Sequence, residues 1–295
     1  MEGGLFMSRK DYLDTYLTMI ALRGLTDHTL KSYRTYISAY LDFVFEFLKK
    51  DPADVSWDEM RLFIKHLQKS RNLADRTINT AISQLRFFTL YVLHKPWDPT
   101  QIPIRKFDQY MPFVPSREEV ALFISAIEDP KIRTMVILMY SSGLRVGEVC
   151  RIKCEDIDRA NMRIHITHGK NRSDRYALLS PLALKELETY WYKCGRPRNF
   201  LFPQRRNPNR PNDPQNVEFH MRLAEDNLHW PHRFTCHSLR HAFATHFYED
   251  THDLLTLKHL LGHKSINSTT IYVTLSNATL GKYASPFDSL KVHHG

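Results

Sequence analysis

The sequence predicts a mainly α-helical protein that carries a small antiparallel β-sheet in the second of two domains. Three observations lead to this fold class. The first hundred residues repeat apolar positions at helical spacing, prolines gather between Lys95 and Pro115, and residues 162–166 alternate between apolar and polar side chains. At 295 residues the chain is too long for one typical core, so we expect two domains, each with its own core.

The first domain, residues 8–99, is expected to be a set of helices. An apolar stripe that starts at Tyr12 stops at Gly24, and a second helix follows at once with Thr26 or Asp27 as its cap. The start signals of two further helices are the capping box of Ser56 with Glu59 and the acidic Asp75.

A proline-rich connector separates the two domains. Because proline disfavours the helix interior, residues 100–115 are expected to form an extended linker. The prolines in and just before this connector are Pro96, Pro99, Pro103, Pro112 and Pro115.

The second domain, residues 116–295, is expected to begin with a helix that Ser116 caps. A further apolar helix should end at Gly143, because glycine readily takes the left-handed conformation that ends helices. Residues 162–166 are expected to pair with Tyr176–Leu179 across a basic hairpin tip, and Pro181 should begin another helix.

The composition favours a polyanionic partner. The formal net charge is +9 and the isoelectric point is about 9.3. Basic residues exceed acidic ones by three up to Tyr110 and by six beyond it, so either domain can meet the same polymer.

The four cysteines include no CxxC pair, which favours reduced thiols in a cytoplasmic protein over a zinc site. We expect no metal, no cofactor and no membrane-spanning segment.

Polar groups in the last third of the chain occur in an order that suits attack on a phosphodiester. His237 and Arg240 are three residues apart, so on a helix they lie on one face. Gly262 can end the next helix and so present His263 at a turn, and Tyr272 follows nine residues later.

Three upstream residues complete this set. Arg145 follows the expected helix end, and Glu148 is placed to hold a guanidinium. Lys170 lies in the hairpin tip. Taken singly, each of these groups also fits a surface, capping or core role, and only their common order favours a shared site.

Six of these groups resemble, in type, order and approximate spacing, the catalytic positions of the tyrosine recombinase (phage integrase) family, and particularly its Xer-like and transposon-borne members. The six are Arg145, Lys170, His237, Arg240, His263 and Tyr272. The segment before them looks like the family's helical, SAM-like core-binding domain. The resemblance implies a two-domain DNA clamp with a tyrosine recombinase catalytic domain.

The resemblance also implies a reaction. A site-specific recombinase of this kind cleaves and rejoins DNA through a 3′-phosphotyrosine, in integration, excision or resolution. Tyr272 would be the nucleophile and His237 its base, because a free tyrosine has a pKa near 10. The two arginines and His263 would bind the non-bridging oxygens, and Lys170 would protonate the leaving 5′ oxygen.

Two basic segments are expected to contact the DNA backbone. They are the hairpin tip Gly169–Arg175 and the loop Lys193–Asn212, which contains six basic residues and no carboxylate. A solvated charged loop is the alternative for the second segment. The residues concerned are Arg172, Arg175, Arg196, Arg198, Arg205, Arg206 and Arg210.

Exchange between two duplexes implies, by the same resemblance, a homotetramer on paired double-stranded DNA sites. Residues Ala278–Leu290 are expected to pack into a neighbouring copy, and an accessory protein is a possible further partner. Two alternatives remain at this stage. One is a DNA-relaxing enzyme similar to type IB topoisomerases, and the other is a DNA-binding regulator without catalysis.

Overall fold

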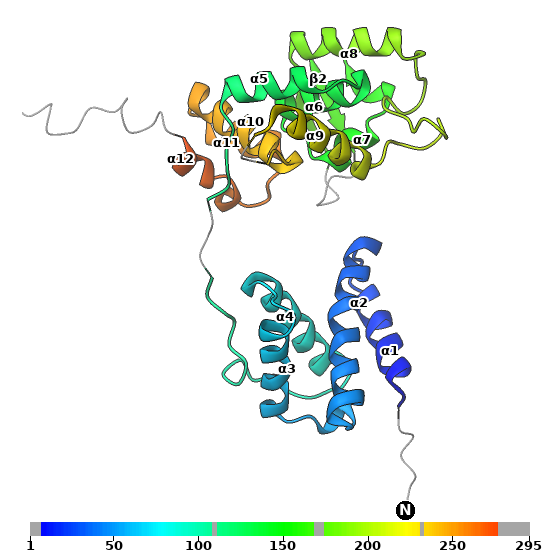
Figure 1. Cartoon of the computed structure of the whole chain (residues 1–295), viewed down its shortest axis with the longest axis vertical. Coiled ribbons are helices and arrows are strands. Elements are labelled where there is room, and N and C mark those ends of the chain that lie inside the picture. Colours follow the sequence, from blue (N-terminus) through cyan, green and yellow to red (C-terminus); the bar gives the residue numbers. More distant parts are fainter. Residues whose placement is uncertain (1–6, 108–110, 168–173, 231–232, 277–295) are drawn as a thin grey trace, which may run out of the picture. The chain divides into compact units, whose positions relative to one another are not determined.

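The computed structural model describes residues 7–107, 111–167, 174–230 and 233–276 (Figure 1). The chain forms two compact units that divide at Tyr110, inside the linker that the prolines predict. Each unit has a hydrophobic core of its own. The expected fold class is confirmed, because helices dominate both units and the second contains a three-stranded antiparallel sheet.

The first unit is helical throughout its regular structure. Thr26 and Ser56 cap their helices as predicted, and the fourth α-helix begins at Asp75 as predicted, with Ala74 at its N-cap position. Its elements are α1 (Arg9–Ala21), α2 (Asp27–Asp42), the π-helical η1 (Phe43–Leu48), the short η2 (Pro52–Asp54), α3 (Trp57–Lys69) and α4 (Asp75–Tyr91).

Aromatic side chains form the centre of this unit. Tyr40 is almost fully buried, and its ring centroid lies 5.3 Å from that of Phe63 and 5.9 Å from that of Phe88. The buried hydroxyl of Tyr16 donates a hydrogen bond of 2.8 Å to Gln84. The four helices are therefore held together by edge-to-face ring contacts and one buried polar contact.

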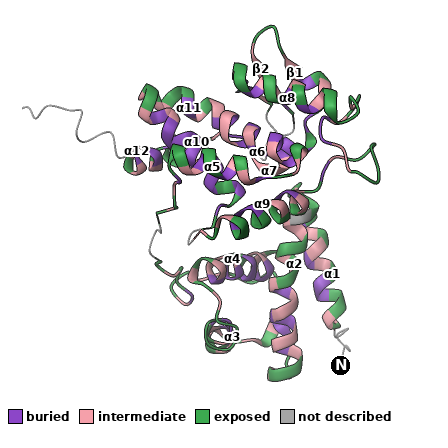
Figure 2. Cartoon of the chain, turned by 45° about the horizontal axis from the view of Figure 1, so that its top comes forward, coloured by how far each residue is buried: buried purple, intermediate pink, exposed green. Residues whose placement is uncertain are grey.

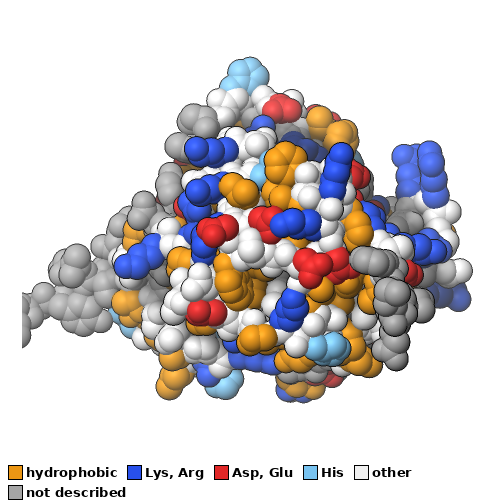
Figure 3. All heavy atoms as spheres, turned by 90° about the horizontal axis from the view of Figure 1, so that it is seen from below, with side chains coloured by type: hydrophobic (Ala, Val, Ile, Leu, Met, Phe, Trp, Pro, Cys, Tyr) orange, Lys and Arg blue, Asp and Glu red, His pale blue; other side chains and the backbone are white. Residues whose placement is uncertain are grey.

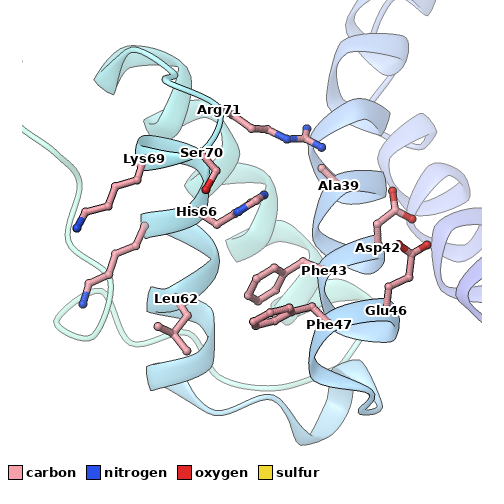
Figure 4. A pocket seen from close by; sticks show the side chains of 11 residues that line it. Ala39, Asp42, Phe43, Glu46, Phe47, Leu62, His66, Lys69, Ser70 and Arg71 are labelled. Carbon is pink, nitrogen blue, oxygen red and sulfur yellow. The ribbon is translucent and has the colours of Figure 1, made fainter.

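An open groove of about 540 Å³ lies between η1 and α3 (Figure 4). Phe43 and Phe47 stack in it with ring centroids 5.1 Å apart, and the ring of His66 lies 5.8 Å from that of Phe43. Glu46 lines it from η1 and Lys69 from α3. The groove therefore combines stacked aromatic rings with an acidic and a basic side.

The start of the predicted linker is part of the first unit. Ile102 is buried in the helical core, and the amide side chain of Asn79 both accepts from the backbone N–H of Arg105 and donates to its carbonyl, each at 2.9 Å. In the second unit, the ring of Phe113 lies 6.1 Å from that of Phe234. The connection between the units is therefore shorter than residues 100–115.

The second unit is built around α6 (Pro130–Ser142), which packs against helices on several sides. Ser116 caps the first helix of this unit, and Gly143 ends α6 at φ +63°, both as predicted. The other helical elements are α5 (Arg117–Ala126), α7 (Val146–Arg151), η3 (Cys154–Asp156), α8 (Pro181–Lys193), α9 (Pro214–Leu228), α10 (Cys236–Thr251), α11 (Leu254–Leu261), η4 (Ile266–Ser268) and α12 (Ile271–Leu275).

The sheet has the order β1 (Ile157–Asp158), β2 (Arg163–Ile166), β3 (Arg175–Leu178), and both pairings are antiparallel. Ile164 and Ile166 point into the core, as their alternation predicts. The strand that pairs with β2 begins at Arg175, one residue before the predicted Tyr176, and Arg175 pairs with Ile166. Arg175 is therefore a strand residue and not part of the hairpin tip, and Lys170 and Arg172 lie outside the described residues.

The segment Lys193–Asn212 forms the predicted loop beyond the last residue of α8. Two isolated bridges hold it, from Lys153 to Phe200 and from Pro203 to Pro211. Figure 2 shows the burial along each element, and on the face in Figure 3 basic, acidic and apolar side chains are interspersed. In the described part of the chain, no helix has the length and hydropathy needed to cross a membrane.

Candidate active site

Arg240, one turn into α10, lies where two other helices end. Its side chain is buried, and it donates to the carbonyl oxygen of Gly143 at 2.5 Å and to that of Leu261 at 2.6 Å. These carbonyls belong to the C-terminal ends of α6 and α11, which carry partial negative charge. Burial, followed by the charge of Arg145, lowers the pKa of Arg240 to about 10, so the guanidinium stays charged at neutral pH.

Two glycines make this arrangement possible. Gly143 and Gly262 end α6 and α11 with φ at +63°, in the left-handed region that favours glycine. A Cβ atom on Gly143 would lie 2.4 Å from the ring of Phe243, and one on Gly262 would lie 2.8 Å from Cδ of Arg175. Both helix ends therefore need glycine for conformation and for space.

Glu148 holds two further arginines. Its carboxylate accepts from Nη1 of Arg145 at 2.8 Å and, through both oxygens, from the guanidinium of Arg175 at 2.8 and 2.9 Å. Burial raises the pKa of this carboxyl, but the hydrogen bonds and charge of Arg175, together with those of Arg145, outweigh burial and hold the pKa at about 2. Glu148 is therefore ionised and supports both guanidinium groups, where the sequence predicts support for one.

Arg175 has a different role from the one predicted. Its Nε donates to the carbonyl oxygen of Leu260 at 2.9 Å, and its side chain is only 9% exposed. These partners hold the guanidinium inside the site, away from the hairpin tip where the sequence analysis placed it. It instead braces Glu148 against the end of α11, a role that the sequence does not reveal because the partners are far apart along the chain.

The charges in this site suit a phosphoryl group. The site contains the guanidinium groups of Arg145, Arg175 and Arg240 and the carboxylate of Glu148, so its net charge is +2. Charge on a transferring phosphoryl group spreads over its equatorial oxygens, and planar guanidinium groups bind such oxygens well. The site therefore has the electrostatics for stabilising a phosphodiester under attack.

His263 has a defined tautomer. Because a guanidinium only donates, the contact of 3.3 Å between Arg240 and Nε2 of His263 makes this nitrogen an acceptor. Nδ1 then carries the proton and donates it to the buried hydroxyl of Thr269 at 3.0 Å. Burial, followed by the charges of Arg240, Arg145 and Arg175, lowers the pKa of His263 to about 4, so the ring is neutral.

Tyr272 lies on α12, beside the arginines, and only 3% of it is exposed. Its ring belongs to a small cluster with Leu257 and Leu261. Burial raises its pKa, and the charges of Arg240 and Arg145 lower it in part. Thr270 occupies the N-cap position of α12, and the hydroxyl of the preceding Thr269 bonds His263.

A residue that the sequence analysis did not assign to the site contacts the tyrosine. Nδ1 of His241 lies 3.2 Å from the hydroxyl oxygen of Tyr272. In the sequence, the feature that could have revealed His241 is its position four residues after His237, which puts both histidines on one face of α10. His237 itself is exposed, and its charge acts on His241.

The remaining predicted DNA contacts lie on the surface of the loop after α8. All five arginines of this set are exposed, and the guanidinium of Arg196 also lies 5.2 Å from the centroid of the Tyr192 ring. They are Arg196, Arg198, Arg205, Arg206 and Arg210. Across the described ranges, no group of three or more acidic, histidine or cysteine side chains is placed to hold a metal ion.

Comparison with known proteins places this chain in a family. The phage integrase family model matches residues 116–278, and the model of the phage integrase N-terminal SAM-like domain matches residues 12–99. A putative integrase/recombinase, y4qK of Sinorhizobium fredii, is 31% identical over 98% of this chain and 94% of its own length. The tyrosine recombinase XerA of Pyrococcus furiosus is 28% identical over 91% of each chain.

Solved structures show the same fold. A lambda integrase dimer bound to a COC′ core site matches 95% of this chain and 99% of its own, with a TM-score of 0.73 at 19% identity. XerH bound to its difH substrate matches 90% of this chain and 82% of its own, with a TM-score of 0.69 at 18% identity. Because the family models cover most of its length and y4qK matches almost all of it, this chain belongs to the phage integrase family of tyrosine recombinases.

Proposed function

We propose that Tyr272, Arg145, Arg240 and His263 form the active site with which this site-specific recombinase cuts and rejoins DNA strands. The observation that carries the proposal is the convergence of these side chains. Arg240 bonds His263 at the ends of α6 and α11, and the charges of Arg240 and Arg145 act on the hydroxyl of Tyr272. A nucleophile beside two fixed guanidinium groups is the arrangement that phosphoryl transfer requires.

The reaction begins with attack of the Tyr272 oxygen on phosphorus. The bond from phosphorus to the 5′ oxygen breaks, and a 3′-phosphotyrosine forms. Lys170, which lies outside the described residues, delivers a proton to the 5′ oxygen, as the resemblance implies. A 5′-hydroxyl from another strand then reverses these steps, so the energy of the phosphodiester is retained.

Binding of the phosphate changes the contacts of His263. In the DNA-free arrangement, Nε2 of His263 accepts from Arg240. A charged phosphate oxygen is a stronger acceptor than a neutral imidazole nitrogen, so it replaces His263 at the guanidinium. His263 then bonds the phosphate only after Nε2 has gained a proton, either in the other tautomer or as an imidazolium.

Double-stranded DNA is the substrate, and copies of the chain assemble on it. A lambda integrase tetramer bound to a Holliday junction shares the fold at a TM-score of 0.70, which supports a homotetramer on paired sites here as well. Residues Ala278–Leu290, outside the described residues, are our candidate for the contact between copies. The exposed arginines of the loop after α8 contact phosphates, and the reaction takes place in the cytoplasm, where the DNA is.

The relatives named above support a recombinase rather than the two alternatives. They are integrases and tyrosine recombinases, and none of them is a DNA-relaxing enzyme or a regulator without catalysis.

The test uses the wild-type protein and Tyr272→Phe with a labelled DNA library from the native locus. Wild type is expected to form protein–DNA adducts that survive detergent, and Tyr272→Phe is expected to form none while binding DNA equally well. Sequencing the trapped DNA gives the site. Adducts with Tyr272→Phe would show that another residue is the nucleophile, and no adducts with DNA-bound wild type would contradict the proposed reaction.

A further inference from the structure

The hydroxyl of Tyr272 forms a hydrogen bond with His241, which is not among the six predicted catalytic residues. The oxygen lies 3.2 Å from Nδ1 of His241, and the two ring centroids are 5.7 Å apart at an interplanar angle of 50°. This distance is within the range over which a general base takes a proton from its partner. With the ring proton on Nε2, Nδ1 of His241 accepts from the Tyr272 hydroxyl, so the nucleophile has a proton acceptor within hydrogen-bond distance.

The position of His241 is fixed by the same helix that carries Arg240. Both residues lie on α10, whose inward face is buried among α6, α11 and α12. A helix holds side chains more precisely than a loop does, which suits a group that must stay aligned with a reacting oxygen. His237, four residues earlier, is exposed.

The surroundings of His241 keep its ring neutral. The ionisable groups that act on it or contact it are His237 and Arg240 on α10, Tyr272 on α12, and His263 after α11. Burial lowers the pKa of His241, and the charges of His237 and Arg240 lower it further. A neutral imidazole has one nitrogen that can accept a proton, and the arriving phosphate adds the negative charge that stabilises an imidazolium beside arginines.

We propose that His241, in place of the His237 that the resemblance implies, is the catalytic residue whose Nδ1 takes the proton of the Tyr272 hydroxyl as that oxygen attacks phosphorus. The inference rests on the proposed function. As the bond between Tyr272 and phosphorus forms and the bond to the 5′ oxygen breaks, the tyrosine proton moves to His241 and a separate proton from Lys170 moves to the 5′ oxygen. In the rejoining step His241 returns its proton to Tyr272, so both groups end as they began.

The test distinguishes removal of the proton from the Tyr272 hydroxyl from delivery of a proton to the leaving 5′ oxygen. One substrate is the native site, and the other is the same DNA with sulfur in place of the bridging 5′ oxygen, because a thiolate leaves without a proton. His241→Phe keeps a ring of similar shape without the nitrogen, and His241→Asn keeps a polar group that cannot act as the base. His259→Phe, at an exposed histidine of α11, is the matched control.

Single-turnover formation of the covalent adduct is measured between about pH 5 and 9, with saturating DNA. We expect His241→Phe and His241→Asn to slow this step by roughly 100-fold or more on both substrates, because general base catalysis contributes that much. Wild-type rates should fall as the pH drops through the pKa of His241, and this acid limb should be absent in both variants. Lys170→Ala should be slow on the oxygen substrate only.

Three results overturn the inference. One is a rate for His241→Phe within about threefold of the His259→Phe control. Another is rescue of the His241 variants by the sulfur substrate, which would assign His241 to the leaving group. The third is near-normal activity of His241→Asn, which would show positioning without proton transfer. If His241→Phe fails to fold, the smaller His241→Asn carries the same test, and adducts with wild type leave the proposed function standing in each case.

Discussion

Replacing Glu148 by glutamine tests how the arginines of the site are held. The pKa of this carboxyl is about 2 in the folded protein against an ordinary value of 4.5. Because the pKa is lowered, its ionised form stabilises the fold above about pH 4.5, and this contribution is lost as the pH falls toward 2. At about 1.4 kcal/mol per pKa unit, the stabilisation at neutral pH is about 3 kcal/mol.

Glutamine keeps the size of the side chain but leaves Arg175, 9% exposed, without its counter-charge. Removing one partner of a buried ion pair costs about 3–5 kcal/mol. For a unit of this size, each kcal/mol lowers the melting temperature by about 2–4 °C. Thermal unfolding at pH 7 should therefore show a loss of about 6 °C or more for Glu148→Gln, and the difference from wild type should shrink in acid below about pH 4.5.

Glu155→Gln is the matched control, because that carboxylate is 73% exposed and pairs with Lys153 at the surface. A double variant, Glu148→Gln with Arg175→Met, should be more stable than the two single losses together predict, by about 1.5 kcal/mol or more. The reasoning is refuted if Glu148→Gln melts within the error of Glu155→Gln, or if the two single losses simply add.

The remaining predictions concern the groups that position the arginines and His263. Gly262→Ala should slow adduct formation by at least about tenfold, because the new Cβ atom meets the side chain of Arg175. The control is Gly195→Ala, at φ +83°, where a Cβ atom would have no neighbour within 4 Å. This variant should lower the stability of the fold without changing the rate of adduct formation. Thr269→Val should lower the adduct rate by about tenfold at unchanged DNA affinity, because His263 loses the hydrogen-bond partner at Nδ1 that orients its ring. Thr269→Ser should restore the rate, and Thr270→Val, which loses only a bond to Asn267, should not lower it. Single-turnover rates, DNA titrations and thermal unfolding check all five variants.

The parts of the fold that the sequence predicted well are set by local chemistry. Caps at Thr26, Ser56 and Ser116 depend on residues three positions away, and the end of α6 depends on one glycine. Neighbours along the chain decide such features, so a pattern in the sequence reveals them. The two residues of β1, by contrast, are too few to show an alternation, and they pair only because β2 lies beside them.

The parts of the site that the sequence missed depend on contacts between distant segments. The bond from Arg175 to Glu148 spans 27 positions, and that from His241 to Tyr272 spans 31. A basic residue beside a hairpin tip and a second histidine on a helix have no local signature that distinguishes them from surface residues. The contact of Thr269 with His263 has no local signature either, because it becomes apparent only once α11 has ended at Gly262.

The amide clamp of Asn79 on Arg105 limits how far one unit can move from the other. Phe113, the next residue with a described contact in the second unit, is eight positions after Arg105, and eight steps along the chain span at full extension no more than about 29 Å. A tether of this length gives the unbound unit an effective concentration of about millimolar once its neighbour has bound DNA. Two units that each bind weakly can thus occupy a site together with high avidity. Lengthening the segment after Arg105 should weaken DNA binding without altering any residue that contacts DNA.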